Sequence, residues 1–175
     1  MADVDVITLR FTIESQYPRL FWCWAATAKS VYSFYFPNSH TWSQCKIAKK
    51  VRHSRLCCTD PLSCDVADEL DKALTITENF VRKLTGTIVR EAIVNELKNT
   101  GRIICARIGW NGGSGHFVAI YGVVRNGNII KLRIGDPLYG SVVQTIVTFN
   151  RNYLGLHGSW SDTYFTDKTM PPGAG

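Results

Sequence analysis

The feature that most constrains the fold of this chain is a change of hydrophobic pattern near residue 101. Before it, apolar residues recur at helical spacing, as in residues 23–36, where small residues precede large apolar ones and Pro37 ends the run. After it, runs rich in Val, Ile and Thr are separated by turn sequences such as Asn126-Gly127. Helices followed by antiparallel strands predict an α+β fold with two lobes and a groove between them.

The same patterns place the expected elements along the chain. We expect helices at 23–36, 42–51, 65–74 and 88–98, and a loop at 56–61. We expect strands at 102–109, 116–124, 128–135 and 141–149, with a short edge strand within 153–165. The length suits a single domain over 1–175, with a helical lobe over about 16–100 and a β lobe over about 101–167.

Composition and charge limit the class of protein. Hydrophobic residues make up 45% of the chain, which is typical of a globular protein. No apolar run approaches the ~20 residues that a membrane span needs, and the first ten residues lack the apolar region of a secretory signal. We therefore expect no membrane partner, and a protein that acts in a reducing cytosol.

The formal net charge is +6, and part of it lies in one basic segment. The residues of this segment are Lys46, Lys49, Lys50, Arg52 and Arg55. Aromatic residues do not alternate with these basic ones, as a surface that stacks nucleic-acid bases would require, so we expect no nucleic-acid partner. The segment is either a solvated helix face or a contact surface for an acidic protein.

Six cysteines raise the question of disulfides or metal binding. The four at 45, 57, 58 and 64 cluster in the sequence, but they contain no C-x-x-C pair and only His53 is nearby. Without a visible secretory signal, we expect free thiols there, with a disulfide and a metal site as the alternatives. Cys105 lies in an apolar run and is expected to be a buried hydrophobic side chain.

Cys23 is the candidate nucleophile because it lies where a loop is expected to give way to a helix. The positive end of the helix dipole and free backbone N–H groups at that point favour thiolate over thiol. The small residues Ala25 and Ala26 follow it. A buried structural cysteine between Trp22 and Trp24 is an equal alternative from this segment alone.

His116 is the best candidate base among the four histidines. It follows the glycine-rich loop 110–115, which includes Trp110 and Gly115, and it starts an apolar strand. A rigid strand behind the ring and a loop of small residues in front are what a catalytic histidine requires. Taken alone, an ordinary half-buried histidine is the commoner case.

Asp136 is expected to return beside His116. A hairpin centred on Asn126-Gly127 pairs position 136 near position 117. A carboxylate there can accept the imidazole N–H, fix the tautomer and stabilise the imidazolium. Asp136-Pro137 also opens a good turn sequence, and both roles can hold together.

Acyl transfer also needs hydrogen-bond donors for the oxyanion. The backbone N–H of Cys23 can supply one. Gln16 lies seven residues before Cys23 in an expected loop, and its side-chain amide is the candidate for the second donor.

These residues, taken in order, resemble the papain-like cysteine peptidases. The resemblance rests on Gln16, on Cys23-Trp-Ala-Ala26, on Gly115-His-Phe-Val118 and on Asp136-Pro137. It is closest to the compact bacterial branches, namely the double-glycine leader peptidases and the effector or toxin peptidases. One departure from papain is position 136, where this chain has aspartate and papain has asparagine. The bacterial branches also use aspartate there. The cysteine cluster at 45–64 has no counterpart in the catalytic pattern.

The resemblance implies a papain-like two-lobe fold and a thiol peptidase that needs no cofactor and no metal. It implies a triad of Cys23, His116 and Asp136, with Gln16 as oxyanion donor and Trp24, Trp110 and Gly115 in contact with substrate. The small residues Ala25, Ala26, Gly112, Gly113 and Gly115 suggest a narrow groove, and therefore cleavage next to small residues, such as Gly-Gly. A stand-alone bacterial relative implies a monomeric toxin or effector, delivered into a target cell or used in bacterial competition, with an inhibitor or immunity protein, perhaps acidic.

Two other functions stay open at this point. One is acyl transfer or deamidation at a protein glutamine, because such enzymes share the Cys-His-Asp set. The other is an inactive papain-like module that only binds a partner.

Overall fold

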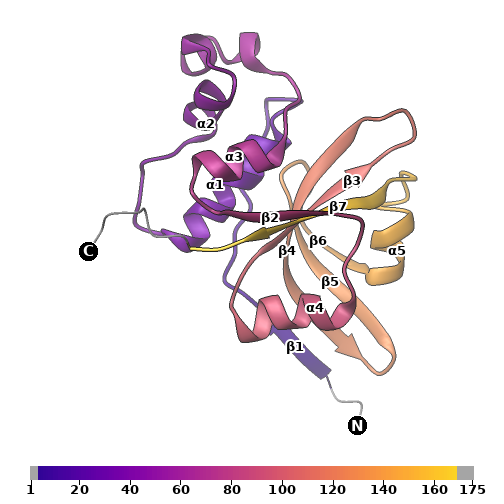
Figure 1. Ribbon diagram of the computed structural model, residues 1–175. Coiled ribbons are helices and arrows are strands. Elements are labelled where there is room, and N and C mark those ends of the chain that lie inside the picture. Colours follow the sequence, from indigo (N-terminus) through magenta and orange to yellow (C-terminus); the bar gives the residue numbers. More distant parts are fainter. Residues whose placement is uncertain (1–3, 169–175) are drawn as a thin grey trace.

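The computed structural model describes residues 4–168, and its helices and strands gather on two sides of the molecule (Figure 1). The ends of the predicted domain, residues 1–3 and 169–175, lie outside the described residues. On one side lie α1 (Cys23–Tyr35), α2 (Gln44–Val51) and α3 (Leu70–Ile76). On the other side the strands form a sheet. This arrangement is the α+β architecture that the sequence predicted.

Helix α1 is the centre of the helical side. It packs against α2, α3 and strand β4 (Gly115–Asn126). Most of its surface is therefore buried, including Trp24, Ala25, Ala26, Ala28 and Val31. The small residues of its first turns are consequently a packing requirement, because they let neighbouring elements approach the helix closely.

Two short turns of 3₁₀ helix occupy the region that was expected to be a loop. They are η1 (Arg55–Cys58) and η2 (Pro61–Cys64). Helix α3 begins at Leu70, five residues later than predicted, and the helix predicted at 88–98 is found as α4 (Arg90–Val94) followed by the π-helical turn η3 (Asn95–Asn99).

The expectation of free thiols at 45–64 is wrong. Cys45 is bonded to Cys58 and Cys57 to Cys64, with Cα–Cα distances of 4.9 and 5.2 Å, which lie in the range that disulfides need. The two 3₁₀ turns bring these positions together, and spacing alone could not show this. Cys105 is free and fully buried in strand β3 (Ile104–Gly109), as expected.

Within residues 4–168, seven strands form one antiparallel sheet in the order β2-β7-β3-β4-β5-β6, with β1 paired to β4. The strands are β1 (Val4–Thr8), β2 (Phe80–Thr85), β3 (Ile104–Gly109), β4, β5 (Ile129–Asp136), β6 (Gly140–Thr145) and β7 (Ser159–Thr166). Strand β4 is long enough to pair with β3 over its first half and with β1 over its second half.

Several predicted elements differ from these strands. β1 and β2 were not predicted, and both belong to the sheet, so the expected division of the lobes at residue 101 does not describe the structure. The strand predicted at 141–149 ends at Thr145, where the Thr145 hydroxyl accepts from the Thr148 N–H and starts α5 (Ile146–Arg151). The predicted edge strand is β7, which lies inside the sheet between β2 and β3.

The sheet is covered on both faces, and this gives the protein two cores. Phe117, Ala119 and Tyr121 of β4 pack with α1, whereas Val118 and Ile120 pack with Phe149 of α5 and with residues from α4 and η3. Strands that are buried on both sides are apolar at nearly every position. This explains the continuous apolar run after His116.

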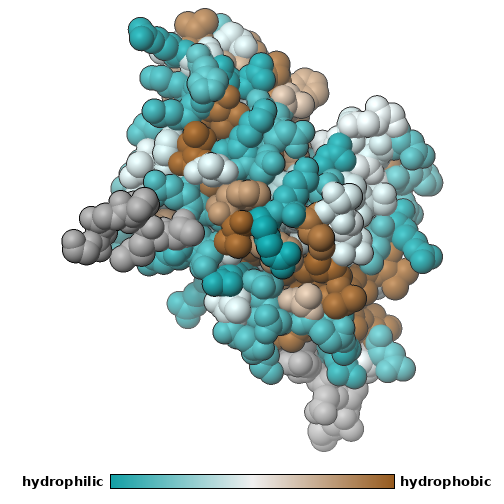
Figure 2. All heavy atoms as spheres, viewed as in Figure 1, coloured by the Kyte–Doolittle hydropathy of each residue, from teal (hydrophilic) through white to brown (hydrophobic). Residues whose placement is uncertain are grey.

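The described residues contain no helix with the length and apolar character needed to cross a membrane. Figure 2 shows mainly hydrophilic side chains over the helical side of this face of the molecule. Lys46, Lys49 and Lys50 of α2 are exposed, and Arg52 forms an ion pair with Asp68.

We predict that reduction of the two disulfides destabilises the protein. The bridges close loops with sequence separations of 13 and 7 residues. Restriction of the unfolded chain by loops of this size stabilises by about 2.5–3 kcal/mol each. For a domain of this length, we therefore expect reductant to lower Tm by roughly 10–20 °C, measured by circular dichroism.

The control is a variant in which Cys45, Cys57, Cys58 and Cys64 are all replaced by serine. Its Tm should be low with or without reductant. An unchanged Tm of the wild-type protein on complete reduction, verified by thiol counting, would contradict the stabilising role of the bridges.

Candidate active site

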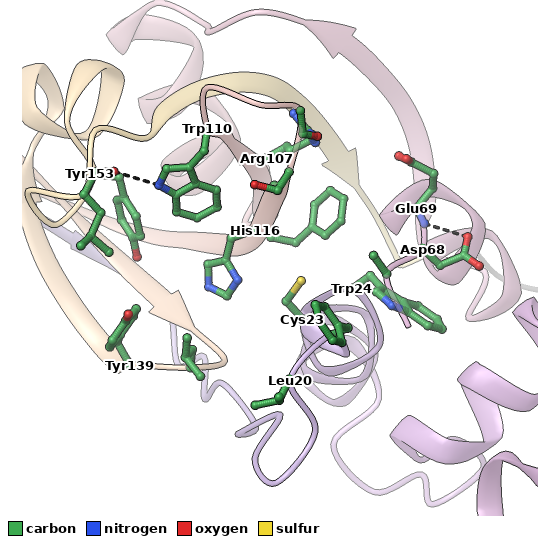
Figure 3. A pocket seen from close by; sticks show the side chains of 18 residues that line it. Leu20, Cys23, Trp24, Asp68, Glu69, Arg107, Trp110, His116, Tyr139 and Tyr153 are labelled. Carbon is green, nitrogen blue, oxygen red and sulfur yellow. Dashed lines mark hydrogen bonds between the residues drawn. The ribbon is translucent and has the colours of Figure 1, made fainter. Parts of the chain in front are cut away.

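Cys23 is the first residue of α1, and its side chain is almost fully buried at the junction of the two sides of the molecule. The backbone N–H groups of a first helical turn have no partner inside the helix, and they point toward groups at the helix start. In Figure 3 the Cys23 sulfur points toward the imidazole of His116. The helix therefore presents the sulfur to a base carried by the sheet.

His116 lies near the start of β4 and is 7% exposed. Its Nε2 lies 2.8 Å from Oδ1 of Asp136, and the Cys23 side chain lies near the same ring and helps to raise the pKa of the imidazole (Figure 3). The ring thus contacts the carboxylate and lies near the sulfur. The other three histidines lie outside the set of residues that line this site.

A β-bulge decides on which face of the sheet Asp136 lies. The β4–β5 pairing runs from Asn126↔Ile129 to Gly122↔Arg133, then shifts by one residue to Ile120↔Ile134 and Ala119↔Gly135. Continued by one residue, the shifted register places Asp136 opposite Val118, on the same face as His116, because directly opposed residues share a face.

Without this bulge, Asp136 would lie opposite Ala119, on the face of the sheet away from His116. The predicted partner, residue 117, was one position away from the observed one. The hairpin spacing therefore brought Asp136 near His116. The bulge that selects the face was not predicted, although Gly122 lies at the register shift and a glycine within a strand can indicate a bulge.

Asp136 is fully buried, and both of its oxygens accept hydrogen bonds. Oδ1 accepts from His116 Nε2 and from the backbone N–H groups of Leu138 (2.7 Å) and Tyr139 (3.1 Å). Oδ2 accepts from the Tyr153 hydroxyl at 2.6 Å. A buried carboxylate is stable only when its oxygens are satisfied in this way. The turn role and the contact with His116, both expected from the sequence, occur together.

The environment favours the ionised form of both members of this pair. Burial opposes the charge on His116, but the hydrogen bonds with Asp136 and Cys23 and the charge of Asp136 raise its pKa to about 9. Burial also opposes ionisation of Asp136, but the hydrogen bonds from His116, Tyr153 and Leu138 and the charge of His116 lower its pKa. The pair is therefore arranged as imidazolium and carboxylate at neutral pH.

Tyr153 was not predicted as part of this site. It follows α5 and is fully buried, and the burial and the Asp136 charge raise the pKa of its phenol, so that it stays a donor. No local pattern marks this tyrosine, because only the path of the chain after β6 brings it beside Asp136.

Gln16 is buried and lies close to the turn after Asp136, since its backbone N–H donates to the Pro137 carbonyl at 2.9 Å. Its amide nitrogen donates to the carbonyl oxygens of Arg19 (3.1 Å) and Leu20 (2.8 Å). These two bonds use both hydrogens of the amide. As an oxyanion donor, Gln16 would have to release one of them.

A cleft of about 470 Å³ runs past Cys23 and His116 (Figure 3). Leu20, Phe21, Ala67 and Glu69 line it from the helical side, and Trp110, Gly115, Leu138 and Tyr139 line it from the side of the sheet. An extended peptide in this cleft would pass directly over the sulfur. The groove between two lobes that the sequence predicted is present.

The three predicted substrate-binding residues all border the cleft, but they differ in exposure. Trp24 is fully buried and donates to the Val66 carbonyl, so it supports the wall. The ring of Trp110 lies 6.3 Å from that of His116 and shields it. A Cβ atom on Gly115 would meet the Arg107 guanidinium at 2.6 Å, so the glycine makes room for this arginine.

Within residues 4–168, no group of three or more His, Cys, Asp or Glu side chains is placed to hold a metal ion. The residues at the site are a thiol, an imidazole, a carboxylate and amides. This set is suited to nucleophilic acyl transfer, with a base beside the nucleophile and a third group that orients the base.

The comparisons with known proteins agree with this geometry. A solved chain from work on the mite allergens Blo t 1 and Der p 1 superimposes with a TM-score of 0.60 at 13% identity, over 90% of this chain and 68% of the other. This similarity shows the papain-like fold. No curated protein gives a significant match. Residues 5–154 match the family model described as papain-like cysteine protease AvrRpt2, and the chain therefore belongs to this family, Peptidase C70, of papain-like cysteine proteases.

Proposed function

We propose that the chain is a cysteine endopeptidase in which Cys23 is the nucleophile, His116 the acid and base, and Asp136 the residue that orients His116. The observation that carries this proposal is the buried His116–Asp136 hydrogen bond, 2.8 Å long, with the Cys23 side chain near the same imidazole. Its open cleft fits a protein substrate bound in extended form.

The proposed reaction proceeds in two steps. The Cys23 thiolate attacks the carbonyl carbon of the scissile bond, the oxygen becomes an oxyanion, and the C–N bond breaks as the imidazolium gives its proton to the departing amine. Water, deprotonated by the neutral imidazole, then hydrolyses the thioester and regenerates the thiolate–imidazolium pair. The Cys23 backbone N–H and the Gln16 amide are the proposed oxyanion donors.

For Gln16, the longer hydrogen bond to Arg19 is the one that we expect to be released when substrate binds. The amide then keeps its bond to Leu20 and presents the second hydrogen to the oxyanion.

We keep cleavage beside small residues, such as Gly-Gly, as the proposed specificity. The argument from small residues that form a narrow groove is weaker, because Ala25 and Ala26 are buried in the core and Gly115 makes room for Arg107. The support that remains is steric, since the bulky side chains of Trp110 and Trp24 both line the cleft that contains Cys23. Substrate profiling that shows bulky residues on both sides of the cut would contradict it.

The role of a bacterial toxin or effector is also a proposal, supported by the resemblance of the sequence to compact bacterial peptidases. The exposed basic face of α2 suits an acidic inhibitor or immunity protein, and we propose a monomer, which gel filtration tests. Action in a reducing cytosol requires that the two disulfides survive there or are dispensable, which melting in glutathione buffers of cytosolic composition would show.

The alternative reaction is deamidation or acyl transfer at a protein glutamine, which the same three residues could catalyse. Mass spectrometry of a treated target separates the two functions. A backbone cut indicates a peptidase, whereas a shift of about 1 Da on glutamine indicates a deamidase. An inactive binding module would give neither product and would leave Cys23 unlabelled by an active-site thiol probe.

We predict that Cys23→Ala abolishes activity while the fold survives, because alanine fills a small buried position without strain. The measurement is the mapping of new protein termini in a cell lysate treated with wild-type protein or with this variant. Cys105→Ala is the matched control, since Cys105 is equally free but lies away from the cleft. New termini produced equally by Cys23→Ala would remove Cys23 from its proposed role.

A second prediction concerns Asp136→Asn. Asparagine can keep its oxygen on His116, because the Tyr153 hydroxyl can turn to accept from the new amide. The charge is lost, and we expect kcat/KM to fall about 10- to 100-fold, which is ~1.4–2.7 kcal/mol of barrier. In Asp136→Ala, kcat/KM should fall further, since nothing then holds the imidazole.

The pH profile distinguishes this role from that of a turn residue. The pKa of His116 is raised to about 9, so the active imidazolium is present below that pH and activity should fall as pH rises through about 9. In Asp136→Asn this fall should move to lower pH. Wild-type rates and an unshifted profile in both variants would show that Asp136 serves only the turn.

A further inference from the structure

We propose that Asp65 is a positioning residue for the nucleophile, which fixes the loop that delivers the Cys23 backbone N–H to the oxyanion. This inference rests on the proposed role of Cys23. Its basis is a set of hydrogen bonds that three consecutive residues, Cys64, Asp65 and Val66, accept from both flanks of Cys23.

The carboxylate of Asp65 accepts from two consecutive backbone N–H groups. Oδ2 accepts from Leu20 and Oδ1 from Phe21, each at 2.9 Å. Such a paired arrangement fixes the direction of the peptide planes as well as their position, and charged acceptors make the stronger hydrogen bonds.

The residues on either side of Asp65 hold the next part of the same loop. The Cys64 carbonyl accepts from the indole N–H of Trp22 at 2.7 Å, and the Val66 carbonyl accepts from that of Trp24 at 3.1 Å. Residues 64–66 therefore form a brace that is hydrogen bonded to four of the five residues from Leu20 to Trp24. The fifth residue, Cys23, is the proposed nucleophile.

The brace is itself anchored. Cys64 is buried and bonded to Cys57, and the Asp65 N–H donates to the Leu62 carbonyl. A disulfide-bonded turn thus gives the brace a fixed place on the helical side.

The loop needs this external support because its own packing is weak. Leu20 is 68% exposed and Phe21 52% exposed, and both side chains line the cleft. No side chain caps the start of α1, since its first flanking residue is Trp22. A displacement of the loop by a fraction of an ångström would move the Cys23 N–H away from the position of the oxyanion, and errors of about 1 Å cost roughly 100-fold in rate.

The test compares Asp65→Ala and Asp65→Asn with Asp60→Ala, all at a temperature where circular dichroism shows a folded protein. Asp60 is a matched control because it is an exposed aspartate of the same disulfide-bonded segment, and within residues 4–168 its side chain forms no hydrogen bond with the loop. Three quantities are measured: kcat and KM on the mapped cleavage peptide, the affinity of the corresponding peptide aldehyde, and the rate of Cys23 alkylation by iodoacetamide.

We expect Asp65→Ala to lower kcat about 10- to 100-fold, with KM changed by roughly twofold at most. We expect Asp65→Asn to lower kcat by a smaller factor, because the remaining side-chain oxygen can still accept a hydrogen bond. The aldehyde forms a tetrahedral adduct whose oxygen occupies the oxyanion position, so its affinity should fall by the same factor as kcat. Alkylation needs no oxyanion donor and should change less than about threefold.

Two results would overturn the inference. One is wild-type kcat in Asp65→Ala, and the other is a fall in alkylation as large as the fall in kcat, which would place the effect on the thiol or on the fold. Either result leaves the proposed protease function intact if Cys23→Ala is inactive, whereas an active Cys23→Ala would refute that function independently.

Discussion

The buried carboxylate of Asp136 is the interaction on which the rest of the site depends. An ionised group in the core costs several kcal/mol unless its oxygens are paired. Here four donors satisfy it, from β4, from the turn after β5 and from Tyr153 beyond α5. The carboxylate thus fixes the imidazole, holds the turn that contacts Gln16, and keeps His116 charged next to a sulfur.

The second constraint is that the nucleophile and the base come from different sides of the molecule. Cys23 belongs to α1, and His116 belongs to the sheet, so their distance is set by how β4 packs on α1. Buried apolar contacts such as those of Phe117 and Ala119 set this packing. The loop before Cys23 is held instead by polar contacts. The Gln16 amide and the brace at 64–66 form hydrogen bonds with the backbone of Leu20 and Phe21.

Local sequence patterns were sufficient to predict α1 and the β4–β5 hairpin, and to select Cys23, His116 and Asp136 as candidate residues. Each of these is marked by residues close in sequence, such as Pro37 or Asn126-Gly127. The disulfides, the interior position of β7 and the contact of Tyr153 with Asp136 could not be predicted in this way. They depend on how distant segments meet. The bulge that places Asp136 on the correct face was also missed, although Gly122 at the register shift is a residue type that can mark a bulge within a strand.

The most direct test of this account is the titration of the His116 imidazole by NMR, with the signal assigned by its absence in His116→Gln. We expect His116 to stay protonated through neutral pH and to lose its proton near pH 9, because Asp136 and Cys23 stabilise the imidazolium. Deprotonation near the ordinary histidine value of about 6.5 would show that this stabilisation is absent, and would contradict the thiolate–imidazolium pair at the centre of the proposed mechanism.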